Sequence, residues 1–90
     1  MTLGLDMPME LIVCAAIRLD QDGLILSLPQ PHRHHHILHR MGQPFPHQQG
    51  FLTSSGRFVD RKEGWLIAAM ADQRIKQTGP EGVLFSEDLW

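Results

Sequence analysis

The sequence of 90 residues has little of several features that define protein classes. It contains one cysteine, Cys14, which excludes an internal disulfide framework. It has no apolar run of the roughly 18 residues that a membrane helix needs, and its first ten residues lack the basic start of a secretory signal. With the histidines neutral the net charge is −2, so there is no excess of positive charge to attract nucleic acid. We therefore expect a cytoplasmic protein without a membrane or nucleic-acid partner.

The sequence patterns of several enzyme classes are also absent. There is no glycine pattern of a phosphate-binding loop or a dinucleotide fold. Ser54 and Ser55 lack the G-x-S-x-G context of a nucleophilic serine. Cys14 lies in the apolar run LIVCAAI, which favours a buried thiol over a reactive one. The absence of these patterns does not exclude an enzyme, but it favours a protein without catalytic activity.

What the sequence does contain is typical of one small globular domain spanning residues 1–90. Apolar residues make up 42% of the chain and charged residues 20%. A chain of this length buries a single core with a thin margin of stability, so a homo-oligomer is also expected. The final residue, Trp90, could anchor such a contact or pack within its own chain.

The order of apolar runs and turn residues predicts an α+β fold, in which an antiparallel sheet of two β-hairpins carries two helices on one face. Residues 10–19 are expected as a central strand that is covered on both faces. Asp22 and Gly23 predict a tight turn into a second strand that ends at Pro29.

The rest of the chain continues this pattern. Residues 31–41 are expected as a helix with Pro31 in its first turn, and residues 43–49 as a connecting loop. Residues 50–59 predict the second hairpin with Gly56 at its turn, followed by a helix over residues 61–73 that Asp60 caps. A turn over residues 77–82 then leads to a short terminal segment.

The first helix is unusual because it holds five of the six histidines, in the run PHRHHHILHR. At about 100° per residue, His34 falls on the apolar side with Ile37, Leu38 and Met41. We expect His34 to be a core residue with one ring nitrogen bonded to a backbone carbonyl, and a catalytic base is the alternative. The other four point outward: His32, His35, His36 and His39.

One hypothesis for the outward histidines is a metal site. His35 and His39 are spaced i,i+4, which brings two imidazoles within reach of one zinc or other divalent ion. The glutamate of the zinc-hydrolase motif H-E-x-x-H is replaced by His36. A third ligand would have to come from outside the helix, with His47, Glu87 and Asp88 as candidates. This hypothesis makes the protein a metal-dependent hydrolase or nuclease.

A second hypothesis is an anion-binding surface for a phosphate or a nucleotide-like ligand. Free backbone amides at the helix start would add to the cationic and hydrogen-bonding side chains. The candidate ligand-binding residues are His32, Arg33, His36, Arg40, Arg57 and Arg61. The third hypothesis is an ordinary solvated polar face near pKa 6.5 on a structural protein with no ligand.

The segment GFLTSSGRFVDRKEGWLIAAMADQ, followed by LFSEDLW, resembles a family of small bacteriophage and prophage proteins. The opening CAAIRL and the histidine-rich helix are similar to that family as well. Gly64 stands where the family pattern has alanine, and MADQ replaces its A-G-Q helix end. The resemblance implies an accessory protein in a bacterial host cell and no particular chemistry. By analogy it favours a binding module for a host protein or a small signal, as in counter-defence.

Overall fold

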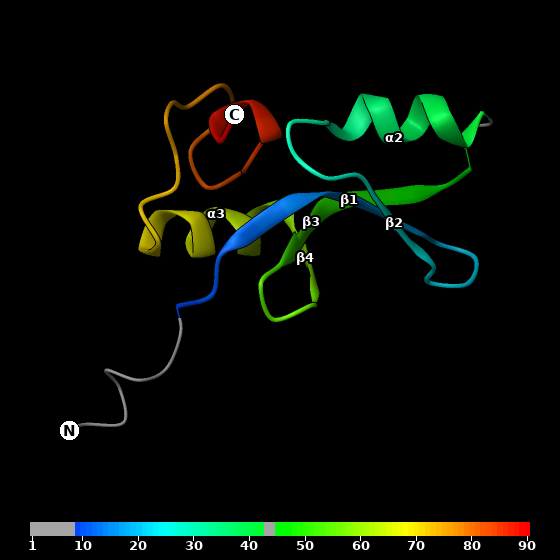
Figure 1. The fold of residues 1–90 in the computed structure, drawn as a ribbon, viewed down its shortest axis with the longest axis horizontal. Coiled ribbons are helices and arrows are strands. Elements are labelled where there is room, and N and C mark those ends of the chain that lie inside the picture. Colours follow the sequence, from blue (N-terminus) through cyan, green and yellow to red (C-terminus); the bar gives the residue numbers. More distant parts are fainter. Residues whose placement is uncertain (1–8, 43–44) are drawn as a thin grey trace.

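The centre of the molecule is an antiparallel sheet with the strand order β2-β1-β3-β4 (Figure 1). The computed structural model describes residues 9–42 and 45–90. The predicted α+β fold, with two hairpins and two helices, is confirmed. In chain order the elements are β1 (Ile12–Leu19), β2 (Ile25–Ser27), α2 (His34–Met41), β3 (His47–Thr53), β4 (Phe58–Asp60), α3 (Arg61–Met70) and the 3-10 helix η1 (Ser86–Asp88).

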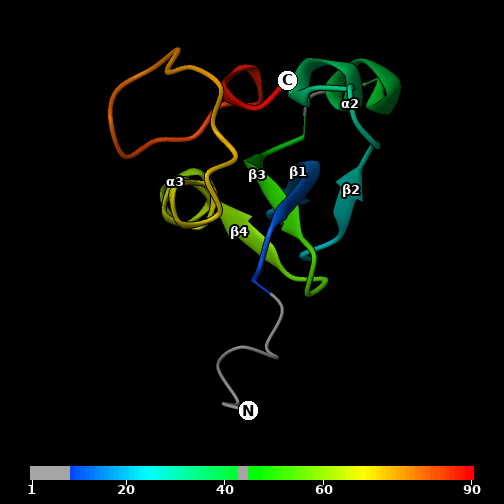
Figure 2. The same ribbon diagram turned by 60° about the vertical axis from the view of Figure 1, so that its left-hand side comes forward.

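The strand register places both helices on one face of the sheet. Phe51 of β3 lies opposite Ala15 of β1 and Val59 of β4, so these side chains share a face. Phe51 and Val59 pack against Trp65 of α3, and Ala15 packs against Ile37 of α2. The C-terminal segment lies between the two helices in Figure 2. Two apolar clusters therefore share one sheet face, one under each helix.

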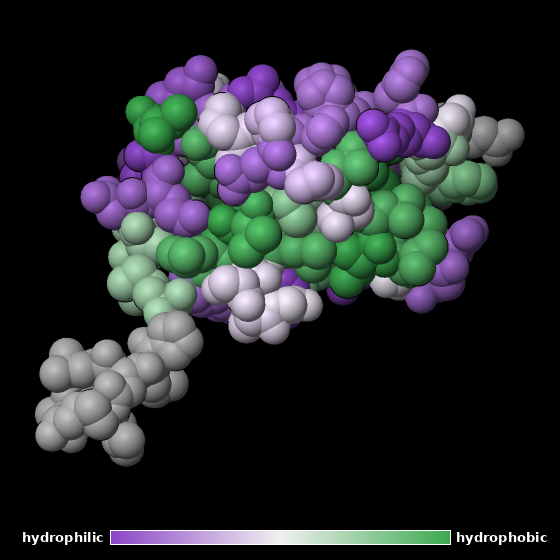
Figure 3. Space-filling model, viewed as in Figure 1, coloured by the Kyte–Doolittle hydropathy of each residue, from purple (hydrophilic) through white to green (hydrophobic). Residues whose placement is uncertain are grey.

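The opposite face of the sheet is more open than the sequence predicts. Val13 is 44% exposed and Ile25 is 38% exposed, and within residues 9–42 and 45–90 no helix covers this side. Figure 3 shows the result as an apolar band across the front of the molecule, where β1 and β2 lie. The prediction that the central strand is covered on both faces is therefore right only in part: Cys14 and Ala16 are buried on this side, whereas Val13 and Arg18 are exposed.

Helix α2 begins three residues later than predicted. The N–H of His32 donates to the carbonyl of Pro29, so residues 29–32 form a turn and Pro31 lies outside the helix. Arg33 is the N-cap residue, in an extended conformation. The predicted end is confirmed, because Gly42 has a φ of 81° and its N–H donates to Leu38.

The predicted loop over residues 43–49 is also partly wrong. Residues 47–49 belong to β3, where they continue the pairing with β1. Residues 43 and 44 lie outside the described residues. The second hairpin is confirmed, with Gly56 at its turn and a φ of 86°.

Helix α3 starts as predicted, because the Asp60 side chain accepts from the N–H of Glu63 at 2.8 Å. It ends at Met70, three residues early, and Asp72 adopts a φ of 55°. The chain turns at Asp72, and Gln73 then contacts the start of β1. The side-chain amide of Gln73 bonds both the N–H and the carbonyl of Ile12, at 2.8 and 3.0 Å.

Gly64 lies where α3 packs closely on the sheet. A Cβ at this position would come within 3.2 Å of the Leu84 and Phe51 side chains. This close contact is the expected compensation for a glycine inside a helix. The difference from alanine in the family pattern thus falls at a point of tight packing.

The C-terminal segment is fixed by Asp88, which is fully buried. Its Oδ1 accepts from the N–H and the hydroxyl of Thr78, and its Oδ2 accepts from the N–H of Phe85. Its backbone carbonyl accepts from the N–H of Ile75 at 2.7 Å. The backbone and side chain of Asp88 together therefore tie residues 75–78 to residues 85–88.

None of the helices in the described part of the chain is long and apolar enough to cross a membrane.

Candidate functional site

Among the five histidines of α2 and the turn before it, His34 is buried, with an exposed fraction of 6%. Its Nε2 donates to the carbonyl of Gly50 at 2.7 Å, and its ring meets Phe51 edge-on. Burial lowers the pKa of His34 to about 4, although the bond to Gly50 opposes this change. His34 is therefore the neutral core histidine that the helix pattern predicts.

Two of the outward histidines support the start of the helix. His36 Nδ1 accepts from the backbone N–H of Arg33 at 2.8 Å, and His32 Nδ1 donates to the carbonyl of Pro29 at 3.0 Å. The His36 ring lies 5.3 Å from the His32 ring and 4.0 Å from that of His35. Burial, followed by the nearby His35, lowers the pKa of His36. His36 thus takes the place of the glutamate or glutamine of a capping box, and His32 bonds the turn before the helix.

An open pocket of about 200 Å³ lies between α2, the start of α3 and η1. Its walls come from four separate parts of the sequence, and its charged groups are two arginines and one glutamate. The lining residues are Arg33, His34, His35, Leu38, Gln49, Arg61, Phe85, Ser86 and Glu87.

Arg61 is the most constrained of these groups. Its Nη1 donates to the carbonyl of Leu84 at 2.8 Å, and its Nη2 donates to Oε1 of Gln49. Its guanidinium lies 4.4 Å above the Phe85 ring. Burial lowers the pKa of Arg61, against the opposing effect of Glu87 and Asp88. The planar group is therefore held in one orientation at the pocket wall.

Arg33 and Glu87 form the other charged part of the wall. Arg33 Nη2 donates to the carbonyl of Trp90, and the Trp90 indole N–H donates to the carbonyl of His32. Burial raises the pKa of Glu87, but its backbone hydrogen bond, Ser86 and the charge of Arg33 together keep it below its usual value. Two arginines and one glutamate thus line the same pocket.

The model of the phage T4 y16D protein family matches residues 11–90. The chain belongs to the phage T4 y16D protein family. No curated protein and no solved structure matches it. The resemblance to small phage proteins in the sequence is confirmed at the level of the family.

In this y16D family chain, some predicted site residues lie apart from the pocket. Arg57 is bound by Glu10 at 2.8 Å and by Glu63 at 2.6 Å, at the β3–β4 hairpin. Arg40 lines a different groove, between β2 and α2. His39 is exposed. Of the predicted anion ligands, Arg33 and Arg61 share the pocket.

The metal hypothesis gains no support from the geometry. Within residues 9–42 and 45–90, no group of three or more histidine, cysteine, aspartate and glutamate residues is arranged to hold a metal ion. Among the candidate third ligands, Asp88 is occupied by Thr78 and Phe85, and His47 Nδ1 bonds to the carbonyl of Phe45. Glu87 alone of the three lines the pocket beside His35. A metal at His35 and His39 stays a prediction.

Sequence reasoning missed Gln49, Phe85 and Ser86 as members of the site. Phe85 and Ser86 reach the site through long-range packing of the C-terminal segment, which has no periodic pattern, and Gln49 belongs to β3 where the sequence predicts a loop. The one signal is Arg61, because an arginine directly after a buried strand needs acceptors nearby, and Gln49 on the neighbouring strand is one of them.

The state of His34 predicts a pH dependence of stability. Its pKa is lower in the folded chain than in the unfolded chain, so between about pH 6.5 and 4 only the unfolded chain gains a proton. The free energy of unfolding should therefore fall as the pH drops through this window, by roughly 3 kcal/mol. Urea denaturation at a series of pH values measures this slope. The slope should flatten in His34→Gln and persist in His39→Gln, and an equal slope in both variants would contradict the assignment.

Proposed function

We propose that this y16D family protein is a non-catalytic binding module whose pocket between α2, α3 and η1 holds a compact anionic ligand, such as the phosphate group of a nucleotide. The observation that supports the proposal most is the convergence of Arg33 and Arg61 on one pocket from distant parts of the sequence. Guanidinium groups bind phosphate oxygens through paired, charge-assisted hydrogen bonds.

The geometry of the two arginines agrees with such a role. Arg61 is oriented by Leu84, Gln49 and Phe85, so little of its conformational freedom remains to be lost on binding. Arg33 Nη1 makes no hydrogen bond with the described residues, and this leaves it available to a ligand. His35 is exposed at the same pocket and adds a ring N–H donor.

Glu87 is the one acidic side chain in the lining, and it restricts the ligand. Two guanidinium groups outweigh one carboxylate, so an anion is still favoured. The Glu87 carboxylate also offers an acceptor, because Ser86 uses only Oε1, at 3.0 Å. A ligand that carries both an anionic group and an N–H or O–H donor fits this combination, and a nucleotide has both.

Arg33→Gln should weaken nucleotide binding by about tenfold or more, because one charge-assisted hydrogen bond contributes roughly 1.5–3 kcal/mol. Arg40→Gln is the matched control, since it removes the same charge from the same helix outside the pocket. Calorimetric titration with nucleoside monophosphates, triphosphates and cyclic nucleotides measures the effect. Equal affinity of the two variants, or no binding by the unmodified protein, would refute the proposal.

The other partners expected from the sequence, a host protein and a second copy of the chain, stay predictions.

A further inference from the structure

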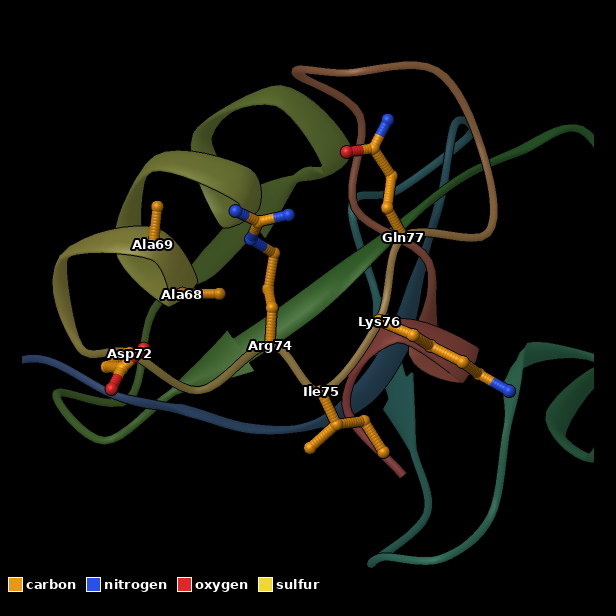
Figure 4. Close-up of a pocket in the computed structure, with 7 residues that line it drawn as sticks. All are labelled: Ala68, Ala69, Asp72, Arg74, Ile75, Lys76 and Gln77. Atoms are coloured by element: carbon orange, nitrogen blue, oxygen red, sulfur yellow. The ribbon is translucent and has the colours of Figure 1, made fainter.

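A second pocket lies on the other side of the C-terminal segment, between the end of α3 and residues 74–77 (Figure 4). Its volume is about 250 Å³. The lining combines the small side chains of Ala68 and Ala69 with the polar groups of Asp72, Arg74 and Gln77. None of these polar residues belongs to the pocket of the proposed function.

Arg74 is the unusual residue of this pocket. Its guanidinium lies 3.9 Å above the ring of Trp65, which is buried in the core. Its Nε is buried and has no hydrogen-bond partner. Nor do its terminal nitrogens donate to any acceptor within residues 9–42 and 45–90. A partly buried guanidinium in this state keeps its charge but lacks the acceptors that normally compensate burial.

The other partly buried arginines show the contrast. The Nε of Arg33 is likewise buried without a partner, but its Nη2 donates to the carbonyl of Trp90, and Arg61 donates to the carbonyl of Leu84 and to Gln49. Arg74 is the partly buried arginine of the described residues that the fold holds by stacking alone. Stacking on an aromatic face fixes the plane of a guanidinium and leaves its N–H edge directed outward.

The neighbouring side chains add to this edge. Figure 4 shows the Arg74 guanidinium and the Gln77 amide projecting to the same side of the segment, whereas Lys76 points away from Arg74. Gln77 Nε2 donates to the carbonyl of Gly79 at 3.1 Å and keeps a second N–H. Asp72 lies at the other end of the pocket. The donors therefore gather at one end, away from the carboxylate.

We infer that this pocket is a second anion site, in which Arg74, stacked on Trp65, and Gln77 bind a phosphate group, either free or in a phosphate monoester. A phosphate presents several oxygens to a guanidinium edge and carries more negative charge than a carboxylate at neutral pH. Asp72 lies at the far end of the pocket, so its repulsion of an anion at Arg74 is weaker than the attraction by the Arg74 guanidinium. This site is independent of the pocket that contains Arg33 and Arg61.

The two tryptophans of the chain allow the two sites to be read separately. Trp65 lies under Arg74, and Trp90 contacts Arg33. In a proton–nitrogen correlation spectrum the two indole N–H signals are assigned with Trp90→Phe. Inorganic phosphate and adenosine monophosphate are then added to the full chain. Phosphate should shift the Trp65 signal, and the Trp90 signal tests the proposed function in the same spectrum.

Arg74→Gln should weaken the Trp65 response to phosphate by about tenfold or more, because it removes the charged donor. Lys62→Gln, an exposed lysine of α3, removes the same charge as a control. Asp72→Asn should strengthen binding several-fold, and asparagine tolerates the φ of 55° at this position. This variant keeps the inference testable if Arg74→Gln fails to fold.

Three results would overturn the inference. The first is a Trp65 signal that does not move up to about 10 mM phosphate or adenosine monophosphate. The second is an unchanged response in both Arg74→Gln and Asp72→Asn. The third is an equal response to acetate, which would mean a general carboxylate site. In the first case, a shift of Trp90 alone would still support the proposed function.

Discussion

The variant Asp88→Asn is expected to lose about 3 kcal/mol of unfolding free energy. Asp88 is fully buried, and its two carboxylate oxygens accept from three donors on Thr78 and Phe85. An asparagine has the same shape but only one acceptor oxygen, so at least one donor would meet an NH₂ group. The buried N–H left without an acceptor accounts for most of the cost.

The same variant should also impair both pockets. Residues 85–87 form a wall of the pocket with Arg33, and residues 74–77 form a wall of the pocket with Arg74. Asp88 joins these two stretches, so its loss should release both. Hydrogen exchange should become faster at the N–H groups of Thr78 and Phe85, and urea denaturation measures the loss of stability.

Thr78→Val is the control for this prediction. It removes the hydroxyl that bonds Asp88 at 2.8 Å and leaves the backbone N–H bond in place. The expected loss is about 1 kcal/mol. If Asp88→Asn were no more destabilising than Thr78→Val, the buried carboxylate would not be what holds the C-terminal segment.

The second large effect is expected for Gly50→Ala. A Cβ at Gly50 would lie 2.1 Å from the carbonyl oxygen of Val59 and 2.7 Å from the Phe58 ring. The Val59 oxygen belongs to the backbone of the neighbouring strand and cannot move without breaking the pairing of β3 with β4. We expect a loss of about 3 kcal/mol or more, measured by urea denaturation.

Gly50→Ala should also disturb the pocket that contains Arg33 and Arg61. The carbonyl of Gly50 accepts the hydrogen bond from His34, so a displaced β3 would release that buried ring. The control is Gly82→Ala, which has a φ of 88° but no atom within 4 Å of the added carbon. Its cost should be about 1–2 kcal/mol, from backbone conformation alone. Equal effects of the two alanines would contradict the steric explanation.

Local sequence signals predict much of the fold because they act over a few residues. Gly23 and Gly56 mark both hairpin turns, and each has the positive φ that such a turn requires. Asp60 caps α3 as expected, through Glu63. Helix ends were predicted less well, because the stop at Asp72 and the late start at Arg33 depend on the turn geometry around them.

The candidate site could be predicted only in part, for a physical reason. Helical spacing separates His34 from the outward histidines, and this separation is an effect within one element. The meeting of Arg61 with Glu87 depends on where Asp88 places the C-terminal segment, and no local pattern carries that information. Arg74 was missed because its significance lies in the acceptors that it lacks, which only a three-dimensional structure can show.

The clamp of Gln73 on Ile12 has a consequence for how the chain assembles. Ile12 opens the first strand, yet both of its backbone groups are bonded by a side chain that lies beyond α3. β1 also pairs with β3, and Ile12 packs in the same core cluster as Trp65 of α3. Apart from the pairing of β1 with β2, these early residues therefore gain their stabilising contacts from late ones. Folding that depends on such distant contacts is slow compared with helical bundles of similar size, and it favours a single concerted step after residue 73 has been synthesised over gradual growth from the first hairpin.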